Sequence, residues 1–237
     1  MLASEAGVVV EVVDRSAIDD RAGADAQTQG VALCAGPVPE LSLAKLIESA
    51  AGRPTPGGSR IVALDGVEDP QNVGALARVA ESAGADGLIL TDRRAPGLTP
   101  TVSRASAGAI EWLPVARVAN LGRALEGLKE AGYWTIAAAP EGSSPLFEME
   151  DRLMTGKLVV VLGAEGKGVR PGLLKLADHR VSIPMQGEVA SLNVATAGAI
   201  LLAADALTEH TPASQLFCRV EILEADDAGG DRRQMVD

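Results

Sequence analysis

Three stretches of the sequence carry polar residues whose types and spacing could do chemistry. Asn72 and Arg78 stand in the first, Glu165 in the second, and Ser191 and Asn193 in the third. Amides, a hydroxyl and a carboxylate can orient a polar substrate through hydrogen bonds. A guanidinium can bind a phosphate or stabilise a developing oxyanion. These residue types suit catalysis by positioning and charge stabilisation, which requires no metal ion.

The second stretch is a glycine-rich loop, Gly163-Ala-Glu-Gly-Lys-Gly168, that follows the apolar run Leu158–Leu162. Glycines at such a place let the backbone approach a ligand or another chain segment closely. The order G-x-x-G-x-G differs from the dinucleotide fingerprint, and the Gly-Lys-Ser/Thr ending of a phosphate loop is missing. Glu165 would repel a pyrophosphate. It suits a cationic ligand or one rich in donors, such as a sulfonium cofactor with an amino-acid tail.

The spacing of Asn72 and Arg78 restricts how they can act together. Six residues on a continuous helix correspond to a rotation of about 120°, so the two can share a ligand only if Asn72 lies in the loop that enters the helix. The simpler alternative is that Asn72 caps a helix and Arg78 is a solvated charge. Ser191 has a similar alternative as a plain helix N-cap.

Short β-branched runs alternate with helical stretches from Arg60 onwards. This alternation predicts an α/β fold with a mostly parallel sheet and helices on both faces. The predicted strands are Ile61–Leu64, Gly87–Leu90, Tyr133–Ala138, Leu158–Leu162 and Val181–Ile183. The predicted helices are Val73–Ala83, with Pro70 in its first turn, Leu121–Ala131, and Leu192–Leu207, which Ser191 opens.

The two ends of the chain read differently from this central part. Val8–Val13 and Val31–Cys34 predict two short strands, which cannot bury a core alone. Leu41–Ala50 predicts a helix, and a Pro- and Gly-rich linker follows it up to Ser59. We therefore expect four regions: 1–38, a partial substrate-binding domain; 39–59, helix and linker; 60–210, the main domain; and 211–237, a tail. The tail predicts a short strand at Cys218–Leu223 and disorder over Ala225–Asp237.

Composition limits the partners and the location of the protein. A net charge of −11 has the wrong sign for a chain whose affinity comes from neutralising phosphates. Arginines gather in the middle of the sequence, at Arg93, Arg94, Arg104, Arg117 and Arg123, which is compatible with a local basic patch. No run is long and apolar enough for a bilayer span, and the first residues carry no signal core, so we expect a cytoplasmic protein. The two cysteines and two histidines lack metal-ligand spacing.

Taken together, the three stretches resemble the motifs of the SpoU-like RNA 2′-O-methyltransferases. The matching elements are Asn-x5-Arg, Gly-x-Glu-Gly-x-Gly, and Ile183-Pro184-Met185 followed by Ser-Leu-Asn-Val-Ala, in this order within residues 60–208. Three ordered blocks are far more specific than one glycine-rich loop. The similarity is greatest to the branch that modifies a guanosine in large-subunit ribosomal RNA, partly because Gln29-Gly30-Val31 resembles the end of that branch's amino-terminal RNA-binding domain. Only the second half of that α/β domain is expected here.

The resemblance implies a fold, a cofactor and a set of site residues. It implies a deep trefoil knot in the carboxy-terminal half, which ordinary connection rules disfavour, and a homodimer acting on structured RNA. S-adenosylmethionine would lie against Gly163, Ile183, Met185 and Leu192. The reacting ribose would lie near Asn72, Arg78, Glu165, Ser191 and Asn193.

The same resemblance assigns roles to these side chains. The family's proposed base matches Arg78, but lowering a guanidinium pKa from about 13.8 to near 7 would cost roughly 9 kcal/mol. We therefore expect Arg78 to anchor a phosphate and stabilise the developing alkoxide. The alternative is that Arg78 acts as the base and that a nearby phosphate receives or relays the proton. Asn72, Ser191 and Asn193 would supply orienting hydrogen bonds. Glu165 would fix the glycine loop and the Arg78 side chain.

Three other functions fit parts of the sequence. One is a 2′-O-methyltransferase that acts on transfer RNA. Another is a dinucleotide-dependent enzyme on an open α/β sheet, which explains the alternation of elements but not the order of the glycines. The third is a catalytically silent RNA-binding or assembly protein on the same scaffold, which the acidic balance favours.

Overall fold

The structure of the protein is a computed structural model that describes residues 7–22, 28–52, 58–139, 144–146, 156–188 and 191–208, with only the backbone described for 204–208. The chain divides into two compact units, Met1–Val38 and Pro39–Asp237. The strand predicted at Cys218–Leu223 and the disorder predicted for Ala225–Asp237 lie outside the described residues.

The two strands predicted in the first unit are wrong. The described residues of this unit contain one helix, α2 (Arg15–Ala22), and a turn in which Gln29 and Gly30 have positive φ angles of 47° and 80°. Val9 and Val12 are 85% and 97% exposed. Two short strands bury too little apolar surface to hold each other, and the described part of the unit supplies no core for them. A partial RNA-binding domain over residues 1–38 stays a prediction.

The second unit is built on an eight-stranded sheet in the order β1-β4-β3-β2-β7-β5-β8-β6, and all its strand pairs are parallel. Its strands are β1 (Glu40–Leu41), β2 (Arg60–Asp65), β3 (Gly87–Thr91), β4 (Val115–Val118), β5 (Trp134–Ala138), β6 (Ser144–Pro145), β7 (Leu158–Gly163) and β8 (His179–Ser182). The predicted parallel sheet is confirmed. Three strands were missed: β1 and β6 are two residues long, and β4 contains an arginine.

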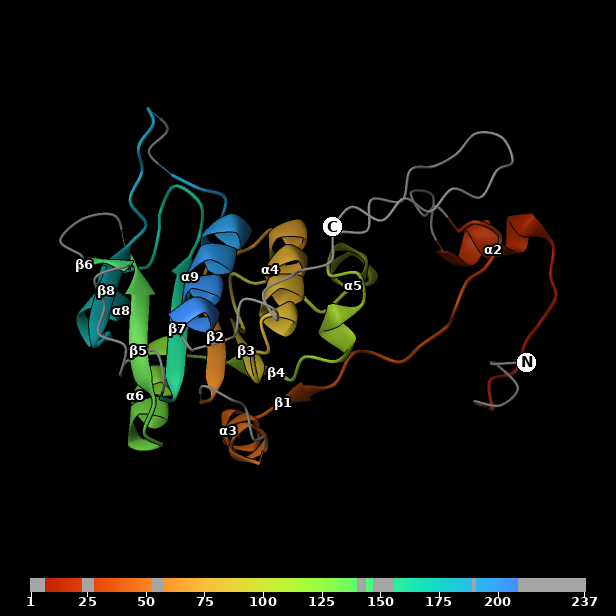
Figure 1. The fold of residues 1–237 in the computed structure, drawn as a ribbon. Coiled ribbons are helices and arrows are strands. Elements are labelled where there is room, and N and C mark those ends of the chain that lie inside the picture. Colours follow the sequence, from red (N-terminus) through yellow and green to blue (C-terminus); the bar gives the residue numbers. More distant parts are fainter. Residues whose placement is uncertain are drawn as a thin grey trace, which may run out of the picture. The chain divides into compact units, whose positions relative to one another are not determined.

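Helices cover both faces of this sheet (Figure 1). They are α3 (Leu43–Ala51), α4 (Pro70–Ser82), α5 (Pro100–Ala105), the 3-10 helix η1 (Ala109–Glu111), α6 (Leu121–Glu130), α8 (Pro171–Leu176) and α9 (Val194–Thr208). Successive side chains of a strand point to opposite faces, so the apolar strands feed two cores. Val62 and Leu64 pack with α4, α5 and α9, whereas Ile61 and Ala63 pack with α3, α6 and α8.

Two late strands lie between earlier ones. β7 lies between β2 and β5, and β8 lies between β5 and β6. β2 and β7 pair over six residues, from Arg60 with Leu158 to Asp65 with Gly163, so their carboxyl ends finish level with each other. This register brings the segment after β2 and the loop after β7 to one place. The trefoil knot stays a prediction.

The start of α4 follows the sequence rules. Asp69 caps the helix by accepting a hydrogen bond from the backbone N–H of Gln71, and Pro70 occupies the first turn, as predicted. In the next turn, Gly74 packs against α5, where an added Cβ would lie 2.4 Å from the Cβ of Ala105. Gly74 therefore fixes which side of α4 faces α5.

A polar cluster ties α6, β5 and the start of β8 together. The Asp178 carboxylate accepts hydrogen bonds from the Lys129 ammonium at 2.7 Å and from the Thr135 backbone N–H and hydroxyl at 2.9 and 2.7 Å. Burial raises the pKa of Asp178, but the hydrogen bonds from Lys129 and Thr135 outweigh it, and the pKa lies below its ordinary value.

Removing the Asp178 carboxylate should therefore have a pH-dependent effect on stability. A depressed folded-state pKa contributes stability that is present above the unfolded-state pKa, about 3.9, and is lost as pH falls through the folded-state value. We expect the difference in free energy of unfolding between the unsubstituted protein and Asp178→Asn to be constant above about pH 5 and to shrink below about pH 4. Denaturant unfolding at several pH values measures it. A difference that stayed constant into strong acid would contradict the linkage.

No helix among the described residues is both long enough and apolar enough to cross a membrane.

Candidate active site

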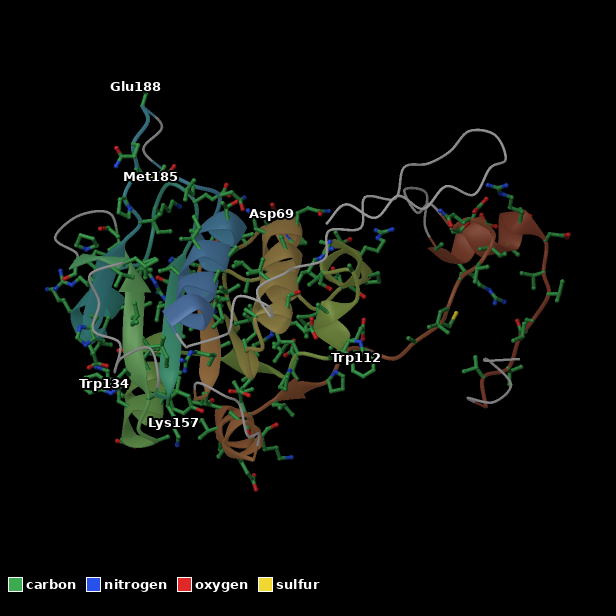
Figure 2. The ribbon with its side chains drawn as sticks, in the orientation of Figure 1. Asp69, Trp112, Trp134, Lys157, Met185 and Glu188 are labelled. Carbon is green, nitrogen blue, oxygen red and sulfur yellow. The ribbon has the colours of Figure 1, made fainter. Side chains whose placement is uncertain are left out.

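The three predicted stretches meet at one edge of the sheet. Because the strands are parallel, β2, β7 and β8 all end at this edge, and helices α4 and α9 begin there. Figure 2 shows Asp69, at the start of α4, and Met185 and Glu188, after β8, at this edge, whereas Trp134 and Lys157 lie at the opposite edge. In open parallel sheets the carboxyl edge is the usual place for a ligand.

Three of the predicted site residues form one hydrogen-bonded cluster. The side-chain amide of Asn193 donates to Oδ1 of Asn72 at 2.8 Å and to Oε1 of Glu165 at 2.6 Å. The amide of Asn72 donates to the same Glu165 oxygen at 3.4 Å. One residue from each stretch thus takes part, although 28 to 121 positions separate them in the chain. Asn193 and Glu165 are exposed and Asn72 is half-buried, so the cluster is open to a substrate.

Asn193 also starts α9. Its Oδ1 accepts hydrogen bonds from the backbone N–H groups of Ala195 at 2.9 Å and Thr196 at 3.4 Å, which is N-cap geometry. The prediction that Ser191 opens this helix is wrong, because Asn193 supplies the cap and the helix begins at Val194. Ser191 lies exposed two residues before the cap. The cap uses Oδ1 and fixes the direction of the Asn193 side chain. The amide nitrogen, Nδ2, therefore points to Asn72 and Glu165.

The glycine loop places Glu165 by a sharp reversal of the chain. An added Cβ on Gly163 would lie 2.0 Å from the carbonyl carbon of Gly168, so the chain can return on itself only past a glycine. The N–H of Gly168 donates to the carbonyl of Ala164 at 2.7 Å, and Gly166 and Gly168 have φ angles of 73° and 63°. The predicted close approach of the backbone therefore occurs between two segments of the chain itself.

Four residues predicted to hold the cofactor come to the same edge. Gly163 ends β7, Ile183 follows β8 and packs against the core beneath α4 and α9, Met185 is 39% exposed, and Leu192 directly precedes the cap of α9. Their contact with one ligand stays a prediction. The side chains present fit S-adenosylmethionine, because the Glu165 carboxylate suits its cationic groups and apolar side chains suit its adenine.

Arg78 does not join the cluster within one chain. Glu165 bonds to Asn72 and Asn193 through Oε1, and no hydrogen bond or ion pair joins it to Arg78 of the same chain. That Glu165 fixes Arg78 stays a prediction. Asn72 lies inside α4 and not in the entry loop. At about 100° per residue, Arg78 points about 120° away from Asn72 and only about 40° from Gly74, which faces α5. Arg78 is exposed on the α5 side of α4.

The five arginines in the middle of the sequence do not form a single basic patch. Arg117 forms an ion pair with Glu40 at 2.9 Å and donates hydrogen bonds to the carbonyls of Thr91 and Pro96. Arg123 lies on α6, which packs on the other face of the sheet. The remaining members, Arg93, Arg94 and Arg104, are exposed on the loop after β3 and on α5.

Asp65 and Arg170 were missed by the sequence analysis. Asp65 ends β2 with 2% of its surface exposed, and its carboxylate accepts hydrogen bonds from the backbone and side chain of Arg170, just after the glycine loop. The signal was present in Leu64-Asp-Gly, because an acidic residue that continues a buried strand needs a partner. Within the described residues, no group of three or more His, Cys, Asp or Glu side chains could hold a metal ion.

Comparison with known proteins identifies the family to which the chain belongs. The sequence model of the SpoU rRNA Methylase family matches residues 59–203. The 23S rRNA (guanosine-2′-O-)-methyltransferase RlmB of Photobacterium profundum is 37% identical over 196 residues, which is 83% of this chain and 77% of the relative.

Solved structures agree with this match. The AdoMet-bound rRNA methyltransferase of Sinorhizobium meliloti superimposes with a TM-score of 0.61 at 28% identity, covering 70% of this chain and 60% of that one. The SpoU methyltransferase AviRb of Streptomyces viridochromogenes, in complex with AdoMet, has a TM-score of 0.57 at 26% identity and covers 64% and 60%.

With these matches, the fold and the site define a class of protein: methyltransferases that have a parallel sheet and a ligand site at the carboxyl edge of that sheet. The chain belongs to the SpoU rRNA methylase family. Membership confirms the predicted class, an S-adenosylmethionine-dependent RNA methyltransferase.

Proposed function

We propose that the chain methylates the ribose 2′-hydroxyl of a guanosine in large-subunit ribosomal RNA, in the cytoplasm. The observation that carries this proposal is the Asn72–Glu165–Asn193 cluster, which joins all three family motifs at one edge of the sheet. Relatives that are 36% to 37% identical bear the name of a 23S rRNA guanosine 2′-O-methyltransferase, which supports the choice of target.

The mechanism assigns the side chains to orientation and charge stabilisation. When bound, S-adenosylmethionine supplies an electrophilic methyl group. Asn72 and Asn193 orient the ribose through their amides, and Glu165 holds both amides in place. Holding the 2′-oxygen in line with the methyl group supplies much of the barrier reduction. Arg78 anchors a neighbouring RNA phosphate and stabilises the negative charge that develops on the 2′-oxygen, while the hydroxyl proton passes by way of that phosphate to solvent. Ser191 adds an orienting hydrogen bond, and Gly163, Ile183, Met185 and Leu192 line the place of the cofactor.

We further propose that the protein is a homodimer and that Arg78 serves the site of the second copy. The support is geometric: Asn72 faces Glu165 and Asn193, while Arg78 points about 120° away from it on the same helix. Because α4 packs on α5 and α9, it cannot turn about its axis to bring Arg78 to the face that Asn72 occupies. In a two-fold dimer each copy can lend the same residue to its partner.

The target is tested by methylation in vitro. The full chain is incubated with methyl-labelled S-adenosylmethionine and either ribosomal or transfer RNA that lacks the modification. Nucleoside mass spectrometry then identifies the product. We expect 2′-O-methylguanosine in large-subunit ribosomal RNA. Label confined to transfer RNA would replace the target, and label on a base would overturn the ribose assignment.

A catalytically silent RNA-binding role is the second candidate, favoured by the net charge of −11. It predicts that the chain binds S-adenosylmethionine and RNA but transfers no label to either RNA. The same experiment therefore decides between the two roles.

A further inference from the structure

The carboxylate of Asp65 is the most deeply buried charge at the candidate site. It accepts hydrogen bonds from the backbone N–H of Arg170 at 2.8 Å and from the Arg170 Nε at 2.7 Å, and Nη2 of the same guanidinium lies 2.7 Å away. The Asp65 side chain is 1% exposed, whereas that of Arg170 is 52% exposed. A buried carboxylate without a partner is costly. The free-energy cost of leaving the Asp65 carboxylate unpaired therefore keeps this ion pair formed.

Asp65 holds both ends of the glycine loop. Its backbone carbonyl accepts a hydrogen bond from the N–H of Ala164 at 3.1 Å, where the loop begins, while its carboxylate binds Arg170, where the loop ends. Glu165 stands between these two points. The loop is already closed on itself by the bond from Gly168 to Ala164. What Asp65 adds is a fixed position of the closed loop relative to β2.

The same strand end leads directly to Asn72. Asp65 is the last residue of β2, and α4 with Asn72 follows after a short turn. The positions of Glu165 and Asn72 are therefore both set from one residue. A shift of about 1 Å would break the 2.6 Å and 3.4 Å contacts that Glu165 makes with Asn193 and Asn72.

We propose that Asp65 and Arg170 are positioning residues for methyl transfer. They act by holding Glu165 against Asn72 and Asn193 and touch neither substrate nor cofactor. We call the contacts of Asp65 with Ala164 and Arg170 the clamp. The effect of the clamp on kinetics rests on the proposed function of the cluster. The clamp itself is a property of the loop and can be measured without turnover.

The first test measures the loop directly. Hydrogen–deuterium exchange of a peptide covering residues 164–168 is compared between the unsubstituted chain and Arg170→Ala. The control is Arg117→Ala, which removes an arginine that also pairs with a carboxylate and with backbone carbonyls, but far from this loop in the sequence. We expect faster exchange of the loop in Arg170→Ala only. Equal exchange in all three proteins would overturn the clamp, and this holds whether or not the protein transfers methyl groups.

The second test links the clamp to Glu165. In the unsubstituted background, Arg170→Ala should lower kcat by about 10-fold or more, because misplacing a catalytic group by 1 Å is costly. In a Glu165→Ala background the same change should lower kcat by less than about two-fold, because residues that act through one another are not additive. Arg170→Lys, which keeps the charge but loses the fork, should fall between Arg170 and Arg170→Ala.

The outcomes separate the clamp from the proposed function. Equal losses of kcat in the two backgrounds would show that Arg170 stabilises the fold without acting through Glu165, and would overturn the proposal. If the unsubstituted chain transferred no methyl group, the proposed function would fail, and the exchange experiment alone would decide the clamp.

Discussion

Replacing Arg78 with alanine is expected to abolish methyl transfer while leaving the affinity for S-adenosylmethionine within a few fold. Loss of one group that stabilises a developing oxyanion costs about 100-fold or more in kcat. Arg78 is exposed and makes no hydrogen bond or ion pair with the described residues, so the variant should fold normally. Single-turnover kinetics measure the transfer step and calorimetric titration measures the cofactor affinity. Arg123→Ala, which removes an exposed arginine on the other face of the sheet, is the control. Retained turnover in Arg78→Ala would remove Arg78 from the mechanism.

Mixing two inactive variants tests whether Arg78 acts across a dimer. Arg78→Ala and Asn193→Ala chains are co-refolded or co-expressed in equal amounts. If Arg78 serves the partner's site, each mixed dimer regains one intact site, and random pairing restores about a quarter of the unsubstituted activity. If Arg78 serves its own chain, every site lacks one residue and no activity returns. The second result would contradict the shared site without excluding a dimer.

Replacing Gly163 with alanine should have the second large effect, on both stability and cofactor binding. The added methyl group would lie 2.0 to 2.2 Å from the backbone of Gly168 and Val169, and no flexible side chain is there to give way. Overpacking of this kind costs about 3 kcal/mol, and any relief must move the loop that carries Glu165. Denaturant unfolding and titration with S-adenosylmethionine measure the two effects.

Gly172→Ala is the matched control for this change. Gly172 lies in α8, nine residues further on, where an added Cβ meets nothing within 4 Å. It should unfold and bind the cofactor as the unsubstituted protein does. Equal behaviour of the two variants would show that the loop tolerates a side chain at Gly163.

Much of the fold could be predicted because periodicity and local rules act over a few residues. The central strands β2 and β7 are continuous apolar runs, as strands buried on both faces must be, and Pro70 marked the first turn of α4. The sequence failed where tertiary contacts decide. β1 and β6 are too short to show a period, and Val8–Val13 resembles a strand but lacks a neighbouring strand in the described part of its unit.

The site was predicted as a set of residues but not as a geometry. Motif order grouped Asn72, Glu165 and Asn193, and the structure joins these three through hydrogen bonds. Sequence spacing could not show that Asn193 rather than Ser191 caps α9, since either side chain can do so. Nor could it show the pairing of Asp65 with Arg170, which depends on two strands ending level with each other.

The most direct measurement is an experimental structure of the chain with S-adenosylmethionine bound. The donor should lie at the carboxyl edge of the sheet, in contact with Gly163, Ile183 and Leu192, with its methyl group facing the Asn72–Glu165–Asn193 cluster. A donor bound at another edge, or with its methyl group turned away from this cluster, would contradict the proposed site.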